Sequence, residues 1–177
     1  MEETDLDTIG QPIDFLGVTY YFRRIVQSGD EHRLLGFSSV RATDDAPPRE
    51  RTSMGWEIFA EGLGELVQRI YPDYGPTPLY ITENGAAFDD VTDDQGVVAD
   101  ERRVEYLRSH IWSLNDAIAA GAAVRGHFAW SSLDNFEWDR GYGQRFGLVR
   151  VDYDSGRRIP KASAHWYRSL ITGGGEA

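Results

Sequence analysis

The sequence predicts an α/β fold in which parallel strands alternate with helices along the chain. Three runs of β-branched and aromatic residues are each followed by a segment whose apolar residues recur at helical spacing. The resulting order β-α-β-α-β-α implies parallel strands joined by right-handed crossovers. No Gly-x-Gly-x-x-Gly string follows the first run, which disfavours a doubly wound nucleotide-binding sheet.

Composition limits the classes of function. With 177 residues, 41% of them hydrophobic, the chain is long enough to bury about two thirds of its unfolded surface. The 18 basic and 29 acidic residues leave a formal net charge of −11, and no window gathers Lys and Arg, so we expect no nucleic-acid partner. There is no cysteine, no basic N-terminal region followed by an apolar stretch, and no run of about 18 apolar residues. We expect a soluble, cytoplasmic protein with no membrane partner.

The first β-α unit occupies the N-terminal part of the chain. A strand is predicted over residues 13–20, Ile-Asp-Phe-Leu-Gly-Val-Thr-Tyr, because this run is rich in β-branched and aromatic residues. A long polar loop is expected to follow it. The first helix is predicted from the apolar spacing between Phe59 and Ile70, and Pro72 with the glycine and prolines after it should end that helix.

The second and third units follow the same alternation. Residues 79–82 form a strand apolar enough to be covered on both faces, as in a buried parallel sheet. A helix is predicted over 104–118, with acidic residues at its positive end and Gly121 at its stop. The third strand is predicted over 124–130 and the third helix over 160–171.

Two features favour a barrel over an open sheet: the absence of a Gly-x-Gly-x-x-Gly string after the first strand and the position of two long connections. The first and third strands are each followed by a connection of about 30 residues, at the strand ends where barrel enzymes build their sites. Residues 148–151 and 157–159 predict a small β-hairpin within the second of these connections. A (β/α)8 barrel needs about 250 residues and eight units. We therefore expect an incomplete (β/α)8 TIM barrel with a hairpin insertion, a single partial domain over residues 1–177.

Glu83 is the first candidate for chemistry. It stands at the carboxyl end of the second strand, between Thr82 and Asn84, whose short polar side chains we expect to hydrogen-bond it. Burying a carboxylate is costly unless it is satisfied, so Glu83 is either functional or caps a local turn.

The third strand leads into Trp-Ser-Ser-Leu-Asp-Asn-Phe-Glu-Trp, which places Glu137 between aromatic rings. Indole faces pack on the C–H face of a sugar ring, and a carboxylate accepts hydrogen bonds from two hydroxyls. The string therefore indicates a sugar site, although the aromatic residues could instead be core and Glu137 a solvated charge. The residues alone would pair Glu83 with Glu137 as nucleophile and acid, since retaining glycosidases hold two carboxyl groups about 5 to 5.5 Å apart.

Two other features have a plain structural interpretation. The acidic segment 89–96 does not have the spacing of an EF-hand loop, so we expect a solvated loop, with no metal and no cofactor. His127 lies within the third strand, and we expect a buried, hydrogen-bonded residue there and not a general base.

Five strings together resemble the family 1 glycoside hydrolases, the β-glucosidases, in the same order along the chain. They are Asp-Phe-Leu-Gly-Val-Thr-Tyr-Tyr at 14–21, Met-Gly-Trp-Glu-Ile at 54–58, Tyr-Ile-Thr-Glu-Asn-Gly at 80–85, Trp-Ser-Ser-Leu-Asp-Asn-Phe-Glu-Trp at 130–138 and Arg-Phe-Gly-Leu at 145–148. The resemblance implies a TIM barrel that hydrolyses β-linked glycosides with retention. The chain would then hold about the last three βα units, strands 6 to 8.

The resemblance also implies roles for six residues. Glu83 matches the nucleophile, and Tyr21 matches the tyrosine whose hydroxyl hydrogen-bonds it, which favours the ionised carboxylate. Glu137 matches the carboxylate that binds two sugar hydroxyls, so it is a binding residue and not the acid. The aromatic residues that match sugar contacts are Trp130, under the glycone sugar, and its neighbours Trp138 and Phe146.

Part of the family's machinery is missing from this sequence. The family carries its acid/base glutamate in an Asn-Glu-Pro string, and none occurs here. Thr19 also stands where the family usually has Asn, and a hydroxyl offers one donor where an amide offers two. We expect a C-terminal segment of a β-glucosidase-like hydrolase of terminal β-linked glucosyl residues, without activity of its own.

Two alternatives remain open at this point. The chain could be a non-catalytic, sugar-binding remnant, or a half-enzyme that needs a complementary N-terminal chain. Three parallel strands leave open sheet edges, which would also permit self-association.

Overall fold

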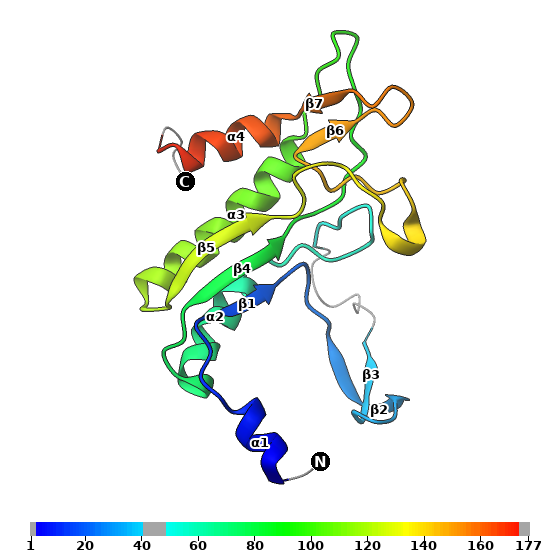
Figure 1. Cartoon of the computed structure of the whole chain (residues 1–177). Coiled ribbons are helices and arrows are strands. Elements are labelled where there is room, and N and C mark those ends of the chain that lie inside the picture. The colour runs from blue at the N-terminus through cyan, green and yellow to red at the C-terminus, as the bar shows by residue number, and fades with distance from the viewer. Residues whose placement is uncertain (1–2, 41–48, 174–177) are drawn as a thin grey trace.

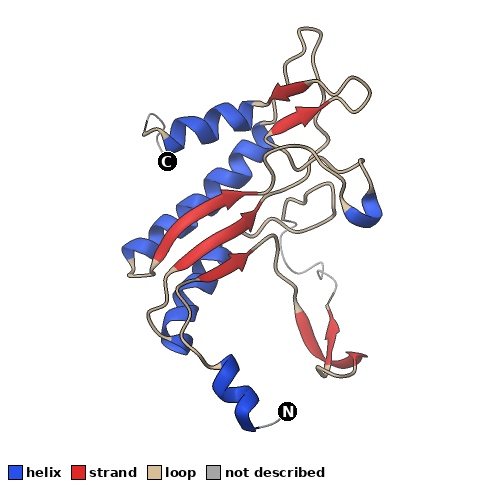
Figure 2. Cartoon of the chain, viewed as in Figure 1, coloured by secondary structure: helices blue, strands red, loops and turns tan. Residues whose placement is uncertain are grey.

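A three-stranded parallel sheet forms the centre of the chain, with helices packed on one of its faces (Figures 1 and 2). The structure is a computed structural model that describes residues 3–40 and 49–173. The strands are β1 (Leu16–Thr19), β4 (Leu79–Asn84) and β5 (Val124–Ala129), in the order β1-β4-β5. Both pairings are parallel. The predicted alternation of strands and helices is therefore confirmed.

The strands are shorter and more one-sided than the sequence indicated. Of the predicted first strand, 13–20, only Leu16–Thr19 pairs with β4. In β4, Leu79 and Ile81 are buried, whereas Tyr80 is half-buried and Thr82 is exposed. The expectation that both faces are covered is thus wrong for the described chain, because α2 and α3 cover only the face of Leu79 and Ile81.

The helices that cover this face are α2 (Glu61–Tyr74) and α3 (Glu101–Ala119). α2 does not end at Pro72 as predicted; it continues for two more residues because Pro72 lies in the last turn, where the missing N–H removes one helical bond at most. Gly75 ends it with φ +85°, and its N–H donates to the Tyr71 carbonyl at 2.8 Å.

The main core lies between the sheet and these two helices. Val18 and Ile81 of the sheet pack with Leu63 and Val67 of α2 and Leu114 of α3, and all five are buried. The burial of apolar side chains from both layers is what holds a helix layer on a sheet. A second cluster, built on Phe88, Tyr106 and Leu107, includes the C-terminal helix α4 (Ala162–Ile171) through Trp166 and Tyr167.

Several smaller elements lie outside the sheet. The predicted hairpin is confirmed as β6 (Val149–Val151) and β7 (Arg158–Pro160). A second antiparallel hairpin, β2 (Val26–His32) and β3 (Phe37–Ser39), occupies part of the segment expected to be a polar loop. Most residues of this hairpin are polar and exposed, so the sequence shows no alternation of apolar and polar residues that would have predicted its strands. Two further elements were not predicted: helix α1 (Glu3–Ile9) and a short 3-10 helix, η1 (Trp138–Arg140).

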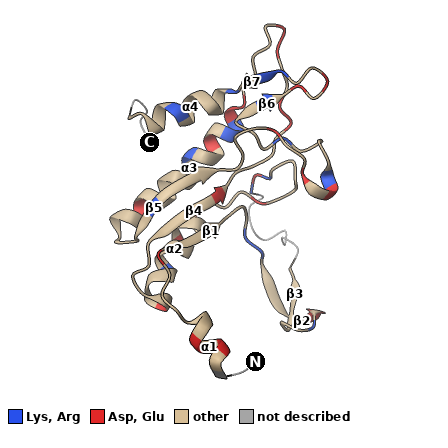
Figure 3. Ribbon diagram, in the orientation of Figure 1, with Lys and Arg blue, Asp and Glu red and all other residues tan. Residues whose placement is uncertain are grey.

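In the described part of the chain, positively and negatively charged residues are both spread over helices and loops (Figure 3). Within that part, no helix combines the length and the apolar character that crossing a bilayer requires.

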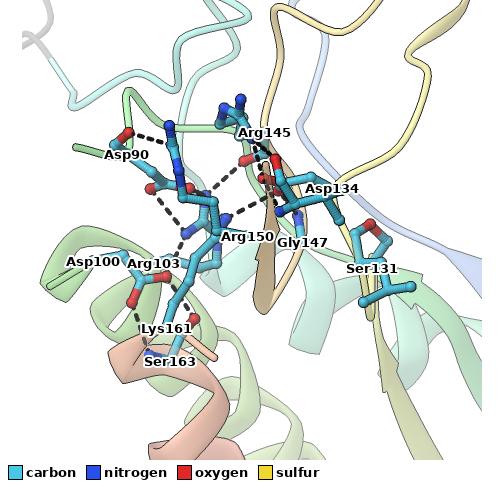
Figure 4. A network of polar contacts seen from close by, with 12 residues as sticks. Asp90, Asp100, Arg103, Ser131, Asp134, Arg145, Gly147, Arg150, Lys161 and Ser163 are labelled. Carbon is cyan, nitrogen blue, oxygen red and sulfur yellow. Dashed lines mark hydrogen bonds and ion pairs between the residues drawn. The ribbon is translucent and has the colours of Figure 1, made fainter. Parts of the chain in front are cut away.

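A buried ion-pair network joins the loops that leave the strands to α3 and α4 (Figure 4). The Lys161 ammonium donates to Asp90, after β4, and to Asp134, after β5, the latter at 3.0 Å. The Arg103 guanidinium of α3 holds both carboxylate oxygens of Asp90, at 3.0 and 2.9 Å. The side chains of these four residues are at most 2% exposed. The expectation that the segment 89–96 is a solvated loop is therefore wrong for Asp90.

Asp100 extends the same network to the start of α4. It was expected to stabilise the positive end of its own helix, α3, but its carboxylate accepts hydrogen bonds from the backbone N–H and the hydroxyl of Ser163 and from Arg103. Asp100 thereby caps α4 with a side chain from α3. This contact fixes how the two helices meet.

Two histidines, the half-buried His127 and the fully buried His110, lie close to the sheet. The His127 ring nitrogens lie 3.0 Å from the Tyr167 hydroxyl and 3.2 Å from Oδ1 of Asn84, which agrees with the expected structural role. His110 is fully buried; its Nδ1 contacts the Tyr106 carbonyl at 2.7 Å, and its Nε2 has no hydrogen-bond partner among the described residues. Burial lowers the pKa of each imidazole to about 4.

Replacing Lys161 by Met should destabilise the chain strongly. The change leaves Asp90 and Asp134 buried without their cation, which typically costs about 3 to 5 kcal/mol. Urea unfolding followed by circular dichroism measures the loss. The matched control is Arg69→Met, which breaks the exposed pair with Asp73 and should cost less than about 1 kcal/mol. Equal losses for both variants would contradict a supporting role for the network.

The stability of the chain should fall as the pH falls from about 6.5 toward 4. Both buried imidazoles have a pKa near 4 in the folded chain, so in this window the unfolded chain binds more protons. Full titration of each is worth about 3 kcal/mol, from about 1.4 kcal/mol per pKa unit. His127→Gln should flatten the slope of unfolding free energy against pH, whereas the exposed His32→Gln should leave it unchanged. An unchanged slope in His127→Gln would refute this account.

Candidate active site

The predicted site residues meet at the carboxyl ends of the three parallel strands. Tyr21 follows β1, Glu83 lies near the end of β4, and Trp130 follows β5. The register pairs Thr19 with Glu83 and Asn84 with Ala129, so the three strands end at the same edge of the sheet. Side chains at this edge lie beyond the last hydrogen bonds between the strands, so they can line one common pocket.

Among the described residues, Glu83 accepts one side-chain hydrogen bond, the one expected from Tyr21. The Tyr21 hydroxyl donates to Oε2 of Glu83 at 2.7 Å. Burial, the hydrogen bond to Glu83 and the charge of Glu83 all raise the pKa of the Tyr21 phenol, so it remains a proton donor at any physiological pH. The Tyr21 ring packs against Trp56 at 5.5 Å and Phe146 at 6.2 Å, which restrains its orientation.

The two neighbours of Glu83 do not hydrogen-bond it, contrary to expectation. The Thr82 hydroxyl donates to the Val18 carbonyl at 3.2 Å, and the Asn84 amide donates to the Tyr20 carbonyl at 2.8 Å. Neither side chain reaches the Glu83 carboxylate, because each hydrogen-bonds a backbone carbonyl group of residues 18–20 instead. Both side chains instead tie β4 to β1.

Thr19, which stands where the family usually has Asn, lies opposite Glu83 in the register. Its side chain is exposed, and its hydroxyl makes no hydrogen bond within the described residues. It adds no contact to Glu83 in this structure.

A pocket of about 330 Å³ opens beside Glu83. All six residues expected at the site line it: Tyr21, Glu83, Trp130, Glu137, Trp138 and Phe146. Three further residues, Trp56, Asn135 and Phe136, complete its walls and were assigned no role from the sequence. Each lies within one of the five strings that resemble the family, and its place in such a string was the feature of the sequence that could have marked it as a site residue. The walls are mainly aromatic, with two carboxylates, which suits a ligand that is both polyhydroxylated and flat-faced.

Glu137 and Trp138 lie on the loop between β5 and β6. The Glu137 backbone N–H donates to the Gly141 carbonyl at 2.7 Å, which closes the turn that contains η1. Partial burial raises the pKa of the Glu137 carboxyl, and the charges of Asp139 and Glu83 raise it further. Trp138 has a φ of +41°, a conformation that is strained for a residue with a side chain, and its ring is 81% exposed.

A glycine allows β4 and the loop after β5 to approach each other beside the site. A Cβ atom on Gly85 would lie 1.8 Å from the Trp130 carbonyl oxygen, so only glycine fits here. The peptide bond between Trp130 and Ser131 is cis. The close approach brings Trp130 next to Glu83 at the pocket wall.

The chemistry available is that of carboxylates, hydroxyl groups and aromatic faces. Among residues 3–40 and 49–173, no group of three or more His, Cys, Asp or Glu side chains is arranged to hold a metal ion. Glu83 combines an accessible carboxylate with a neutral phenol donor, which is the arrangement expected of a supported nucleophile.

Known proteins of one family match this chain in sequence and in fold. The family model of glycosyl hydrolase family 1 matches residues 1–176. The 1,4-β-D-glucan glucohydrolase of Thermotoga neapolitana is 43% identical over 173 residues, which cover 98% of this chain and 38% of that protein. β-Glucosidase A of Thermotoga maritima is also 43% identical, over 171 residues. The chain therefore spans a little over a third of the length of these relatives.

Solved structures agree with the sequence matches. The β-glucosidase from Thermotoga maritima in complex with glucoimidazole superposes with a TM-score of 0.88 at 40% identity, over 98% of this chain and 38% of that one. The same enzyme in complex with deoxynojirimycin gives the same values. These neighbours are TIM barrels, so the α/β fold of the described residues is a fragment of that architecture. The chain belongs to glycosyl hydrolase family 1.

Proposed function

We propose that this chain carries the nucleophile side and the sugar-binding side of a β-glucosidase-type retaining active site. The observation that supports this most directly is the 2.7 Å hydrogen bond from the Tyr21 hydroxyl to the Glu83 carboxylate in a pocket walled by aromatic rings. The proposed substrates are terminal β-linked glucosyl residues. The relatives named β-glucosidase and β-D-glucan glucohydrolase support that substrate class.

In the proposed reaction, Glu83 attacks the anomeric carbon of the sugar. The bond from that carbon to the aglycone oxygen breaks, a covalent glycosyl-enzyme forms, and water later hydrolyses it with retention. The Tyr21 hydroxyl keeps one carboxylate oxygen of Glu83 hydrogen-bonded, so the other is oriented toward the sugar. Glu137 accepts hydrogen bonds from two sugar hydroxyls, Trp130 stacks under the ring, and Trp138 and Phe146 contact it from the side.

The departing aglycone oxygen needs a proton that no residue proposed above supplies. The Asn-Glu-Pro string in which the family carries its acid/base is absent from these 177 residues. We propose that residues 1–177 form a single partial domain, strands 6 to 8 of the barrel, and that the other βα units provide this glutamate. Units in a longer chain and units in a separate N-terminal chain would pair equally with the free edges of β1 and β5.

Sugar binding without hydrolysis is the second candidate function. It is favoured by the pocket, which holds Trp130, Glu137 and Trp138 independently of any residue outside the chain. Both candidate functions predict that the chain binds a sugar, and only the first predicts hydrolysis once the remaining βα units are supplied.

Deoxynojirimycin should bind the chain, and Glu83→Gln should weaken that binding. The protonated iminosugar carries a positive charge, which pairs with the carboxylate in the pocket; losing a charged hydrogen bond costs about 1.5 to 3 kcal/mol, or roughly 10- to 100-fold in dissociation constant. Tryptophan fluorescence follows the titration. Glu137→Gln should weaken binding similarly, whereas Asp139→Asn on the same loop lies outside the pocket and should not. Binding that is insensitive to both pocket variants would contradict the assigned site.

Phenyl β-glucoside should not be hydrolysed by the 177-residue chain alone. A general acid contributes about 10²- to 10⁴-fold and the remaining units also position the substrate, so no turnover above that of Glu83→Gln is expected. Mixing with a chain that carries the first five βα units should restore phenol release. If the chain alone hydrolyses the glucoside and Glu83→Gln abolishes that turnover, the prediction of inactivity is wrong. If the chain binds sugar but the added units restore no turnover, the sugar-binding function is favoured.

A further inference from the structure

A second hollow lies on the helical side of the molecule, away from the pocket at Glu83. It has a volume of about 530 Å³, against about 330 Å³ for the pocket at Glu83, and the two share no lining residue. Its walls come from the first half of α2, from the second half of α3 and from the segment before α2. A volume of this size accommodates a short oligosaccharide.

Small residues at the helix contact form the floor of this hollow. Gly64 of α2 and Ser113 of α3 touch: the Gly64 N–H donates to the Ser113 hydroxyl at 3.2 Å, and a Cβ on Gly64 would lie 2.4 Å from that oxygen. Ala60 and Ser109 line the hollow beside this contact. Because the floor lacks bulky side chains, space remains between the longer side chains that stand on the rim.

Trp112 of α3 forms one wall. Its side chain is 46% exposed, and its indole N–H makes no hydrogen bond with any described residue. Scattered exposed aromatic residues are common, so the ring alone indicates nothing. Here the ring borders a hollow and is accompanied by hydrogen-bonding groups from the facing helix α2 and from α3 itself.

Those groups are Glu65 and Gln68 of α2 and Asp116 of α3, whose side chains make no hydrogen bond within the described residues. The cation at the rim, Arg49, is already paired with Glu61 at 3.2 Å. The remaining charge is negative, which excludes anionic ligands. Carboxylates that accept and an amide that both accepts and donates match the hydroxyls of a neutral sugar.

We propose that this hollow is a second carbohydrate-binding site, which takes a short β-linked oligosaccharide with one ring stacked on Trp112 and its hydroxyls bound by Glu65, Gln68 and Asp116. The combination of an indole face with carboxylates is the same as at Trp130 and Glu137. The β-linked ligand class rests on the proposed function, whereas the position of the site does not. A glycan held here occupies no part of the pocket at Glu83, so both sites bind at once.

The test is a titration of the ¹⁵N-labelled 177-residue chain with cellotetraose, following the indole N–H signals of its five tryptophans by NMR. Trp112→Phe identifies the Trp112 signal. That signal should shift saturably, in the wild type and equally in Glu137→Gln. Gln68→Ala and Asp116→Asn should each raise the dissociation constant read from it by about tenfold, the loss of one good hydrogen bond. Glu105→Gln, an exposed acid of α3 outside the hollow, is the matched control and should change nothing.

The outcomes separate the two sites. A Trp112 signal that stays unmoved while the Trp130 signal saturates overturns the second site and leaves the proposed function intact. A Trp112 signal that responds to spermine and not to cellotetraose overturns it in favour of a cation site. Shifts at Trp112 without shifts at Trp130 and Trp138 support the second site and count against the proposed function.

Discussion

The buried pairing of Asp90 and Asp134 with Lys161 and Arg103 is the interaction on which the rest of this chain depends. Asp90 follows β4 and Asp134 follows β5, so the network holds the loops after both strands onto α3 and α4, and the loop after β5 carries Glu137 and Trp138 of the pocket. Buried charges are tolerated only when each is paired and hydrogen-bonded, and here two carboxylates and two cations satisfy one another. Arg145 adds a further cation, 2.6 Å from Asp134, from the segment that precedes Phe146.

The charged residues that support the loops are different from the carboxylates that line the pocket. The ion pairs lie behind the loops, where water is excluded, whereas the two pocket carboxylates, Glu83 and Glu137, lie at the open ends of the strands. Among the described residues, the Glu83 carboxylate has one phenol donor and no ion pair with a cation. A carboxylate neutralised by a buried cation would be a poor nucleophile, so the separation leaves Glu83 available for the proposed attack.

Local sequence patterns were sufficient to predict some elements of the fold and failed for others. The alternation of strands and helices and the hairpin at β6 and β7 follow from apolar periodicity and turn residues, which act over a few neighbours. The hairpin of β2 and β3 was missed because its exposed polar strands carry no such periodicity. The expectation that Thr82 and Asn84 hydrogen-bond Glu83 was wrong, because both side chains donate to carbonyl groups of residues 18–20, which lie far along the chain. Asp90 was taken for a solvated acid because its cations lie far along the chain.

By itself the sequence determined the alternation of the three parallel strands with their helices, the family resemblance and the six residues expected at the site. Those conclusions depend on residue identity and spacing, which are local properties of the chain. Only the tertiary structure decided that Trp56 completes the pocket, that Asp100 caps α4 and that a hollow opens beside Trp112. Each of these joins segments distant along the chain, and their meeting is set by how the helices pack on the sheet and not by any short string of residues.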